Sequence, residues 1–241
     1  FQKTKKNIIF EEHLLSELAK FNSEYFPSPE YKRKVRKGEI NEKEYAKEKE
    51  LKFLEIYNDL VKKHRIKIKQ GKNENFLDKW FLAPVREEID FLFQELKSVK
   101  NIQVKKLLAI ILSRTVRSCR ATTHADLGTL KEPVTTTYYC KKHGKICKPI
   151  FSITGWWQRY TIDTLNRLKE FDKLRTETFQ ICLTGDSRTI DICEETKKKN
   201  PEFAEILSKQ KIRGIFSSPT YVGRIDYNEQ HAYAYEIFGF K

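Results

Sequence analysis

A short apolar run near the end of the chain leads into a turn whose residues could act together. Residues 214–216 are Gly-Ile-Phe, and residues 217–221 are Ser-Ser-Pro-Thr-Tyr. The Ser218 hydroxyl and the Pro219 carbonyl can each accept a hydrogen bond, and the Tyr221 ring can stack against a planar ligand. The pattern is typical of a strand that ends at an active site. A Ser-Pro dipeptide is also common in surface turns, which is the alternative interpretation.

A second apolar run lies upstream and also ends in polar residues. Residues 179–187 are Phe-Gln-Ile-Cys-Leu-Thr-Gly-Asp-Ser, so this run delivers Gly185 and Asp186 at its tip. Between the two runs the sequence predicts a helix over residues 200–209, because Asn200 can cap it and Pro201 suits its first position. The order predicts a βαβ unit with both polar tips at strand carboxyl ends, where open α/β sheets bind ligands.

The Ser-Pro-Thr-Tyr string resembles the Ser/Asp/Asn-Pro-Pro-aromatic motif of DNA amino-methyltransferases, with Thr220 in place of the second proline. The stretches 114–127, 138–149 and 225–236 are also similar to one group of these enzymes. The resemblance covers roughly residues 80–241, and the first 75 residues or so match no family by inspection.

The resemblance implies a reaction and roles for individual residues. The enzymes transfer a methyl group from S-adenosylmethionine to an exocyclic amine of a DNA base, as in restriction-modification systems. Ser218 and the Pro219 carbonyl would orient the amine, and Tyr221 would stack the base after it leaves the helix. Gly185 and Asp186 would lie near the cofactor. A motif led by serine favours cytosine N4 over adenine N6 by family habit.

Two departures from the family pattern leave alternatives open. Thr220 is less rigid than proline, so the direction in which the Pro219 carbonyl points is less constrained. None of the nine glycines forms a Gly-x-Gly, so the glycine-rich cofactor loop of the family is missing. We therefore expect a piece of a larger or split enzyme, with that loop on a flanking segment or partner chain. The alternative is a non-catalytic DNA-binding specificity subunit or fragment.

The composition favours a nucleic-acid partner. Lysine and arginine exceed aspartate and glutamate by 47 to 33, a formal net charge of +14. Such a charge suits double-stranded DNA, and RNA is a weaker alternative. The sequence contains neither a membrane-length apolar stretch nor the apolar core of a signal peptide. Five cysteines without regular spacing predict a reducing, cytoplasmic location.

Four arginines are candidate DNA contacts. Arg114, Arg117 and Arg120 recur every three residues toward the end of an apolar helix predicted over residues 104–120, so they stay near one side of it. They could bind phosphates or interact with the helix dipole. Arg224 lies just after the Ser-Pro-Thr-Tyr turn and could contact the flipped base or the DNA backbone.

A cysteine and histidine cluster is a candidate zinc site. Cys140, His143 and Cys147 have a spacing that suits a tetrahedral zinc ion, with Cys119 or His124 as the fourth ligand. The alternative is a set of ordinary buried cysteines with a surface histidine.

These observations predict an α/β fold, in which a helix-rich N-terminal part precedes a partial Rossmann-like methyltransferase βαβ unit. We expect a charged helical region over residues 1–75, a helical and loop-rich region that contacts DNA over 76–175, and the partial α/β unit over 176–241. The sequence also predicts a helix over about 158–174 with Ile162, Leu165, Leu168 and Phe171 as its apolar set.

Overall fold

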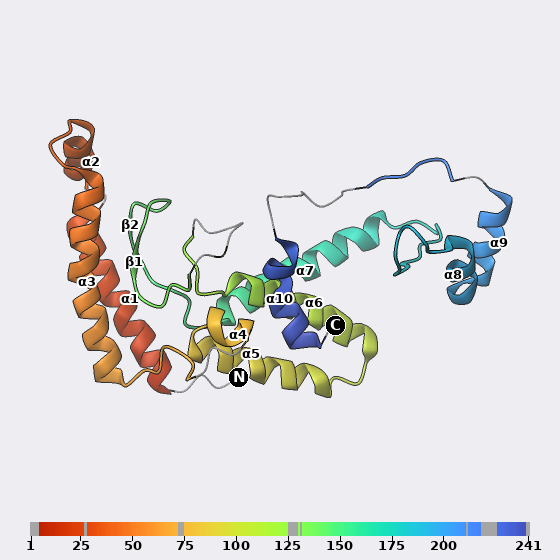
Figure 1. Cartoon of the computed structure of the whole chain (residues 1–241), viewed down its shortest axis with the longest axis horizontal. Helices are drawn as coiled ribbons and strands as arrows, with labels where there is room; N and C mark the ends of the chain where they lie inside the picture. The colour runs from red at the N-terminus through yellow and green to blue at the C-terminus, as the bar shows by residue number, and fades with distance from the viewer. Residues whose placement is uncertain are drawn as a thin grey trace. The chain divides into compact units, whose positions relative to one another are not determined.

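A computed structural model describes residues 5–26, 28–71, 75–124, 130, 132–210, 212–217 and 226–239 (Figure 1). The chain divides into two compact units. The first unit comprises Phe1–Thr164 together with Gly223–Lys241, and the second comprises Leu165–Val222. The domain ranges expected from the sequence remain predictions. No helix among the described residues carries an apolar stretch long enough to cross a membrane.

Two long helices begin the first unit. Helices α1 (Lys5–Tyr25) and α3 (Glu42–His64) lie side by side in Figure 1, and the short α2 (Pro29–Arg36) lies between them in sequence. Helix α1 buries an apolar stripe of residues that recur at helical spacing, Phe10, Leu14, Leu18 and Phe21. Helix α3 starts at Asn41, whose side-chain oxygen accepts from the Lys43 amide at 3.1 Å.

The remaining helices of the first unit surround α6. Helices α4 (Phe76–Trp80), α5 (Ala83–Ser98) and α6 (Ile102–Ser118) follow one another, and α10 (Tyr227–Phe238) returns from the end of the chain to contact α4 and α6 (Figure 1). The side chain of Glu236 on α10 accepts from the backbone amides of Phe76 and Leu77 at 2.6 and 2.9 Å. It thereby satisfies amides that α4 leaves unpaired at its N-terminus.

A small antiparallel hairpin completes this unit. Strand β1 (Tyr138–Cys140) pairs with β2 (Lys145–Cys147), with Tyr139 opposite Ile146. The Asn22 side chain exchanges two hydrogen bonds with the backbone of Ile146, at 2.9 and 3.0 Å, which fixes the hairpin against α1. Ile146 itself belongs to the shared apolar core.

Helix α7 (Thr154–Leu174) begins in the first unit, and α8 (Ile192–Lys199) and α9 (Pro201–Lys209) belong to the second. The predicted helix over 200–209 is confirmed, with Asn200 accepting from the Phe203 amide at 3.0 Å and Pro201 at the first position. The predicted helix over 158–174 is also confirmed as part of α7. Its expected apolar set, Ile162, Leu165, Leu168 and Phe171, is instead exposed.

The α/β prediction needs correction for the described part of the chain, which is mostly helical. The apolar runs within residues 179–187 and at 214–216 were expected to be parallel strands, but neither segment belongs to a sheet. Ile215 is 92% exposed and Phe216 is fully exposed. A strand needs a neighbour to pair its backbone groups, and neither segment has one here. The helix-rich N-terminal part is confirmed.

Candidate nucleic-acid interface

A basic pocket of about 460 Å³ lies in the first unit, at the C-terminal end of α6. Its lining contains five cationic side chains and no acidic one. Besides small and apolar residues, the pocket is lined by Arg114, Arg117, Arg120, Lys142, Lys148, His124, Tyr138, Trp156 and Tyr160. The three arginines that the sequence singled out therefore come together at one concave surface.

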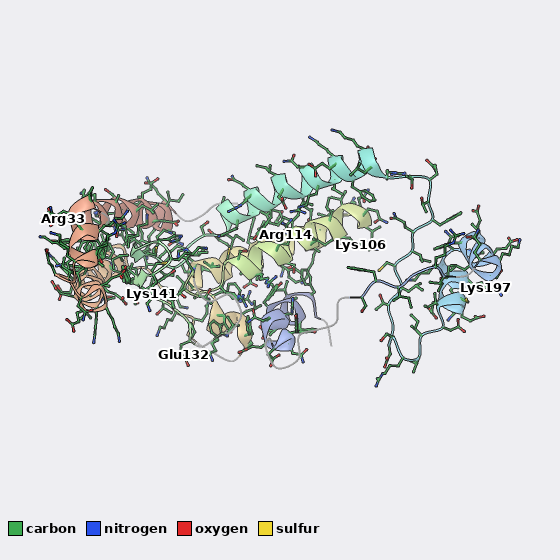
Figure 2. The ribbon with its side chains drawn as sticks, turned by 90° about the horizontal axis from the view of Figure 1, so that it is seen from above. Arg33, Lys106, Arg114, Glu132, Lys141 and Lys197 are labelled. Carbon is green, nitrogen blue, oxygen red and sulfur yellow. The ribbon has the colours of Figure 1, made fainter. Side chains whose placement is uncertain are left out.

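Arg114 links α6 to α7. Its guanidinium donates to Asp163 at 2.6 Å and to Thr164 at 3.0 Å, and it lies over the ring of Tyr160 with 4.3 Å to the centroid. Figure 2 shows Arg114 on α6, with Lys106 nearer the start of the same helix. Because its charge is already paired, Arg114 mainly orients this wall of the pocket.

Arg117 and Arg120 differ in their surroundings. Arg117 is exposed, and it forms no ion pair with any other residue that the structure describes. Arg120 is only 7% exposed, and it donates to Gln230 on α10 at 2.9 Å and to the Arg117 carbonyl at 3.2 Å. Arg117 is therefore the more available cation, whereas Arg120 holds two helices together.

An aromatic wall faces these cations. Trp156 and Tyr160, one helical turn apart on α7, stack with ring centroids 5.6 Å apart. The Tyr160 hydroxyl lies 2.7 Å from that of Ser118 on α6. Trp156 packs against the core and lines the pocket as well. Tyr160 was not singled out, although its i, i+4 spacing from Trp156 was visible.

Two lysines extend the positive surface beyond the arginines. Lys148 forms an ion pair with Glu11 of α1 at 2.8 Å, and both side chains are largely buried. Lys142 is exposed in the turn between β1 and β2. Neither lysine was singled out from the sequence, because the hairpin that carries them is remote from α6 along the chain. Cations interleaved with aromatic rings are the side chains that bind nucleic-acid backbones and bases.

The predicted cysteine and histidine cluster forms beside this pocket. The ligand atoms of His124, Cys140, His143 and Cys147 all lie within 4.8 Å of one another. Of the two residues considered as a fourth member, the structure brings His124 to the group. Cys119 instead belongs to the apolar core, where burial and Glu88 raise the pKa of its thiol. Burial and the neighbouring His143 lower the pKa of His124, which favours its neutral imidazole.

Asp186 and Gly185 lie in the second unit. The Asp186 carboxylate accepts from the Arg188 guanidinium at 2.6 Å and from the Arg188 amide at 3.0 Å. These hydrogen bonds hold the pKa of Asp186 below its usual value. A side chain on Gly185 would approach Ile190 to 2.8 Å, so a larger residue requires Ile190 to move. Their expected role near the cofactor remains a prediction.

The candidate catalytic residues Ser218, Pro219 and Tyr221, together with Arg224, lie outside the described residues. The chain is described again from Asp226, whose side chain accepts from the Glu229 amide at 3.0 Å and caps α10. Gln230, one turn further along α10, receives the hydrogen bond from Arg120. Helix α10, which follows the motif along the chain, is therefore hydrogen-bonded to one of the pocket arginines.

The chain is similar to the Type II methyltransferase M.MjaII of Methanocaldococcus jannaschii. The two sequences are 46% identical over 231 residues, which covers 92% of this chain and 42% of that relative. This identity shows homology between the chain and a segment of the relative, and the chain spans less than half of the relative's length. No family model and no solved structure matches the chain.

Proposed function

We propose that this chain is part of a DNA methyltransferase that transfers a methyl group from S-adenosylmethionine to an exocyclic amine of a base. The observation that carries the proposal is the 46% identity to a type II methyltransferase along 92% of the chain. We further propose a restriction-modification or related system as the context. Cytosine N4 is the favoured target, because serine leads the motif.

The basic pocket is proposed to hold the DNA backbone near the reacting base. Arg117 would contact phosphate, because it is exposed and forms no ion pair within the described part of the chain. Trp156 and Tyr160 would contact sugars or bases, since aromatic faces stack on bases without regard to sequence. The hydrogen bond between Arg120 and Gln230 supports this placement, because it ties the pocket to the helix that follows the motif.

We propose that the motif acts by orienting the exocyclic amine of the base. Acceptors at Ser218 and the Pro219 carbonyl would draw the two N–H groups of the amine into the geometry of an attacking nucleophile. Tyr221 would stack the extruded base. Arg224 would contact the base or the backbone beside it.

The residues present supply only part of a cofactor site. Asp186 offers an exposed carboxylate for a hydroxyl or ammonium group, but Arg188 occupies it here, and the chain contains no Gly-x-Gly loop. S-adenosylmethionine would supply the electrophilic methyl group. We propose that a flanking segment or a partner chain carries the glycine-rich loop and the neighbouring strands, against which the apolar runs within residues 179–187 and at 214–216 would pair as sheet.

A non-catalytic DNA-binding specificity module is the second candidate. Thr220 in place of proline and the missing glycine loop favour it. Cofactor binding separates the two, because a module of this kind binds DNA without affinity for S-adenosylmethionine.

The test is methyl transfer from labelled S-adenosylmethionine to mixed-sequence duplex DNA, followed by nucleoside analysis. It is run on the chain alone and on the longer protein or assembly that contains it. Label in N4-methylcytosine supports the full proposal, and label in N6-methyladenine changes only the target base. DNA binding without label or cofactor binding in either sample assigns the chain to the second candidate.

A further inference from the structure

The geometry points to a structural zinc site formed by His124, Cys140, His143 and Cys147, beside the basic pocket. His143 Nδ1 lies 3.6 Å from the Cys140 Sγ and 3.5 Å from the Cys147 Sγ, and His124 Nδ1 lies 3.6 Å from the Cys140 Sγ. Zinc bonds of about 2.3 Å to sulfur and about 2.0–2.1 Å to nitrogen, at tetrahedral angles, place the two ligand atoms about 3.6 Å apart. The observed separations match that value.

The hairpin explains how three of these residues converge. Cys140 ends β1, Cys147 ends β2, and His143 occupies the turn between them. The turn is tight, since the amides of His143 and Gly144 both donate to the Cys140 carbonyl, at 3.1 and 2.7 Å. Gly144 has a φ of 61°, a conformation that glycine adopts without strain. The sequence Cys-x2-His-x3-Cys is therefore a chelating loop.

The fourth residue comes from a separate segment. His124 is held over the hairpin by its backbone N–H, which donates to the Tyr138 hydroxyl at 3.2 Å. Its ring lies 4.5 Å from that of His143, centroid to centroid. The site would have two sulfur and two nitrogen ligands and no position left for water. This composition is typical of a structural zinc centre, whereas a catalytic centre keeps one position open.

Without an ion, the cluster is held by weak contacts between sulfur and imidazole nitrogen and by the Tyr138 hydroxyl, which lies 3.0 Å from His124 Nδ1. Thiols are weak hydrogen-bond partners, and two buried cysteines beside two imidazoles gain little from one another. Zinc binds cysteine as the thiolate, so the ion would give both thiols a strong partner.

The ion would stabilise a weak part of the fold. Each strand has only three residues, and a two-stranded hairpin of this size is marginal in water. His124, Tyr138 and Lys142 also line the basic pocket, so zinc would fix that wall of the pocket. This last consequence rests on the proposed function, whereas the metal site does not.

Zinc content tests the site without reference to methylation. The full chain, purified without added metal, is analysed by plasma mass spectrometry and should contain about one zinc ion per chain. His143→Ala, in the exposed turn, should lower the content to below about 0.1. His143→Cys should restore it, because cysteine supplies a ligand of the same site. Cys193→Ser, which removes an exposed cysteine of the second unit, should retain one zinc ion.

Chelation and cobalt replacement distinguish the loss of a metal ligand from the loss of the fold. The chelated protein should bind one cobalt ion and show thiolate-to-cobalt charge transfer, and Cys140→Ser should weaken that band. Circular dichroism of each variant then reports its helix content. Sub-stoichiometric metal in the folded protein, or one zinc ion retained in a folded Cys140→Ser, His143→Ala double variant, would overturn the proposal. Zinc without methyl transfer leaves the site established and rejects only the enzyme activity.

Discussion

Arg120, two residues beyond the end of α6, donates to the side-chain oxygen of Gln230 on α10 at 2.9 Å, although 110 residues separate them in the sequence. Both side chains are buried, at 7% and 3% exposure. The bond joins the segment that follows α6 to the helix that follows the Ser-Pro-Thr-Tyr motif.

Replacement of Arg120 by leucine should destabilise the first unit. The change leaves Gln230 buried without its charged donor, and a hydrogen bond to a charged group contributes about 1.5–3 kcal/mol. We expect a loss of about 2 kcal/mol in the free energy of unfolding, measured by urea denaturation. Arg120→Lys should recover part of the loss. Unchanged stability in Arg120→Leu would contradict the role assigned to this bond.

Replacement of Arg117 by alanine should weaken DNA binding without affecting stability. Its side chain is exposed, so the free energy of unfolding should change by less than about 0.5 kcal/mol. Loss of one phosphate contact should reduce the slope of log affinity against log salt by about 1. Lys106→Ala removes an exposed cation of the same helix outside the pocket and is the matched control (Figure 2). Equal effects of the two variants would exclude a specific contact at Arg117.

Replacement of Ser218 by alanine should abolish methyl transfer while DNA affinity is retained. The variant loses one acceptor for the base amine, and loss of a single group that stabilises a transition state costs at least about 100-fold in rate. Single-turnover transfer to duplex DNA is the measurement. The neighbouring variant Ser217→Ala should keep its activity. Full activity in Ser218→Ala would rule out the assigned mechanism.

Replacement of Glu236 by alanine should destabilise α4. Its carboxylate accepts from two backbone amides at the start of that helix, and loss of such a cap costs about 0.5–2 kcal/mol. Urea denaturation should show a loss in this range, with a smaller one for Glu236→Gln. Asn228→Ala, on the exposed face of the same helix, should stay within about 0.5 kcal/mol. A loss in Asn228→Ala as large as in Glu236→Ala would show that the effect is not specific to the cap.

Mild acid should destabilise the pair of long helices through His64. Burial, His13 on α1, and the nearby Lys63 and Lys6 lower the pKa of His64 in the folded protein. The unfolded chain therefore takes up the proton first, and stability falls as the pH drops below the ordinary histidine value of about 6.5. The urea midpoint should fall between about pH 7.5 and 5.5, and less so in His64→Gln. An equal fall in both proteins would assign the effect to another group.

The sequence predicted those elements that depend on interactions between residues close together in the chain. The stripe of α1 and the Asn200-Pro201 start of α9 were visible because caps and helical periodicity act within a few residues. The spacing of Cys140, His143 and Cys147 likewise brought three ligand atoms together within one hairpin. His124 could not be chosen over Cys119 in advance, because that choice depends on how a distant loop packs.

Features that depend on partners far along the chain escaped prediction. The aromatic wall of the pocket comes from Tyr160, which meets Ser118 only after α7 folds back along α6. The apolar residues of α7, including Leu165 and Phe171, are exposed, and periodicity indicates an apolar face but not what covers it. The two apolar runs, within residues 179–187 and at 214–216, join no sheet among the described residues for the same reason, because pairing requires a neighbouring strand.

The capping of α4 by Glu236 sets an order for folding on the ribosome. The Leu77 amide is synthesised 159 residues before the carboxylate that pairs with it. At about 5–20 residues per second, α4 waits roughly 10–30 s for α10 to emerge. During that interval Tyr233 and Ile237, which are buried on α10 in the folded protein, are not yet in place.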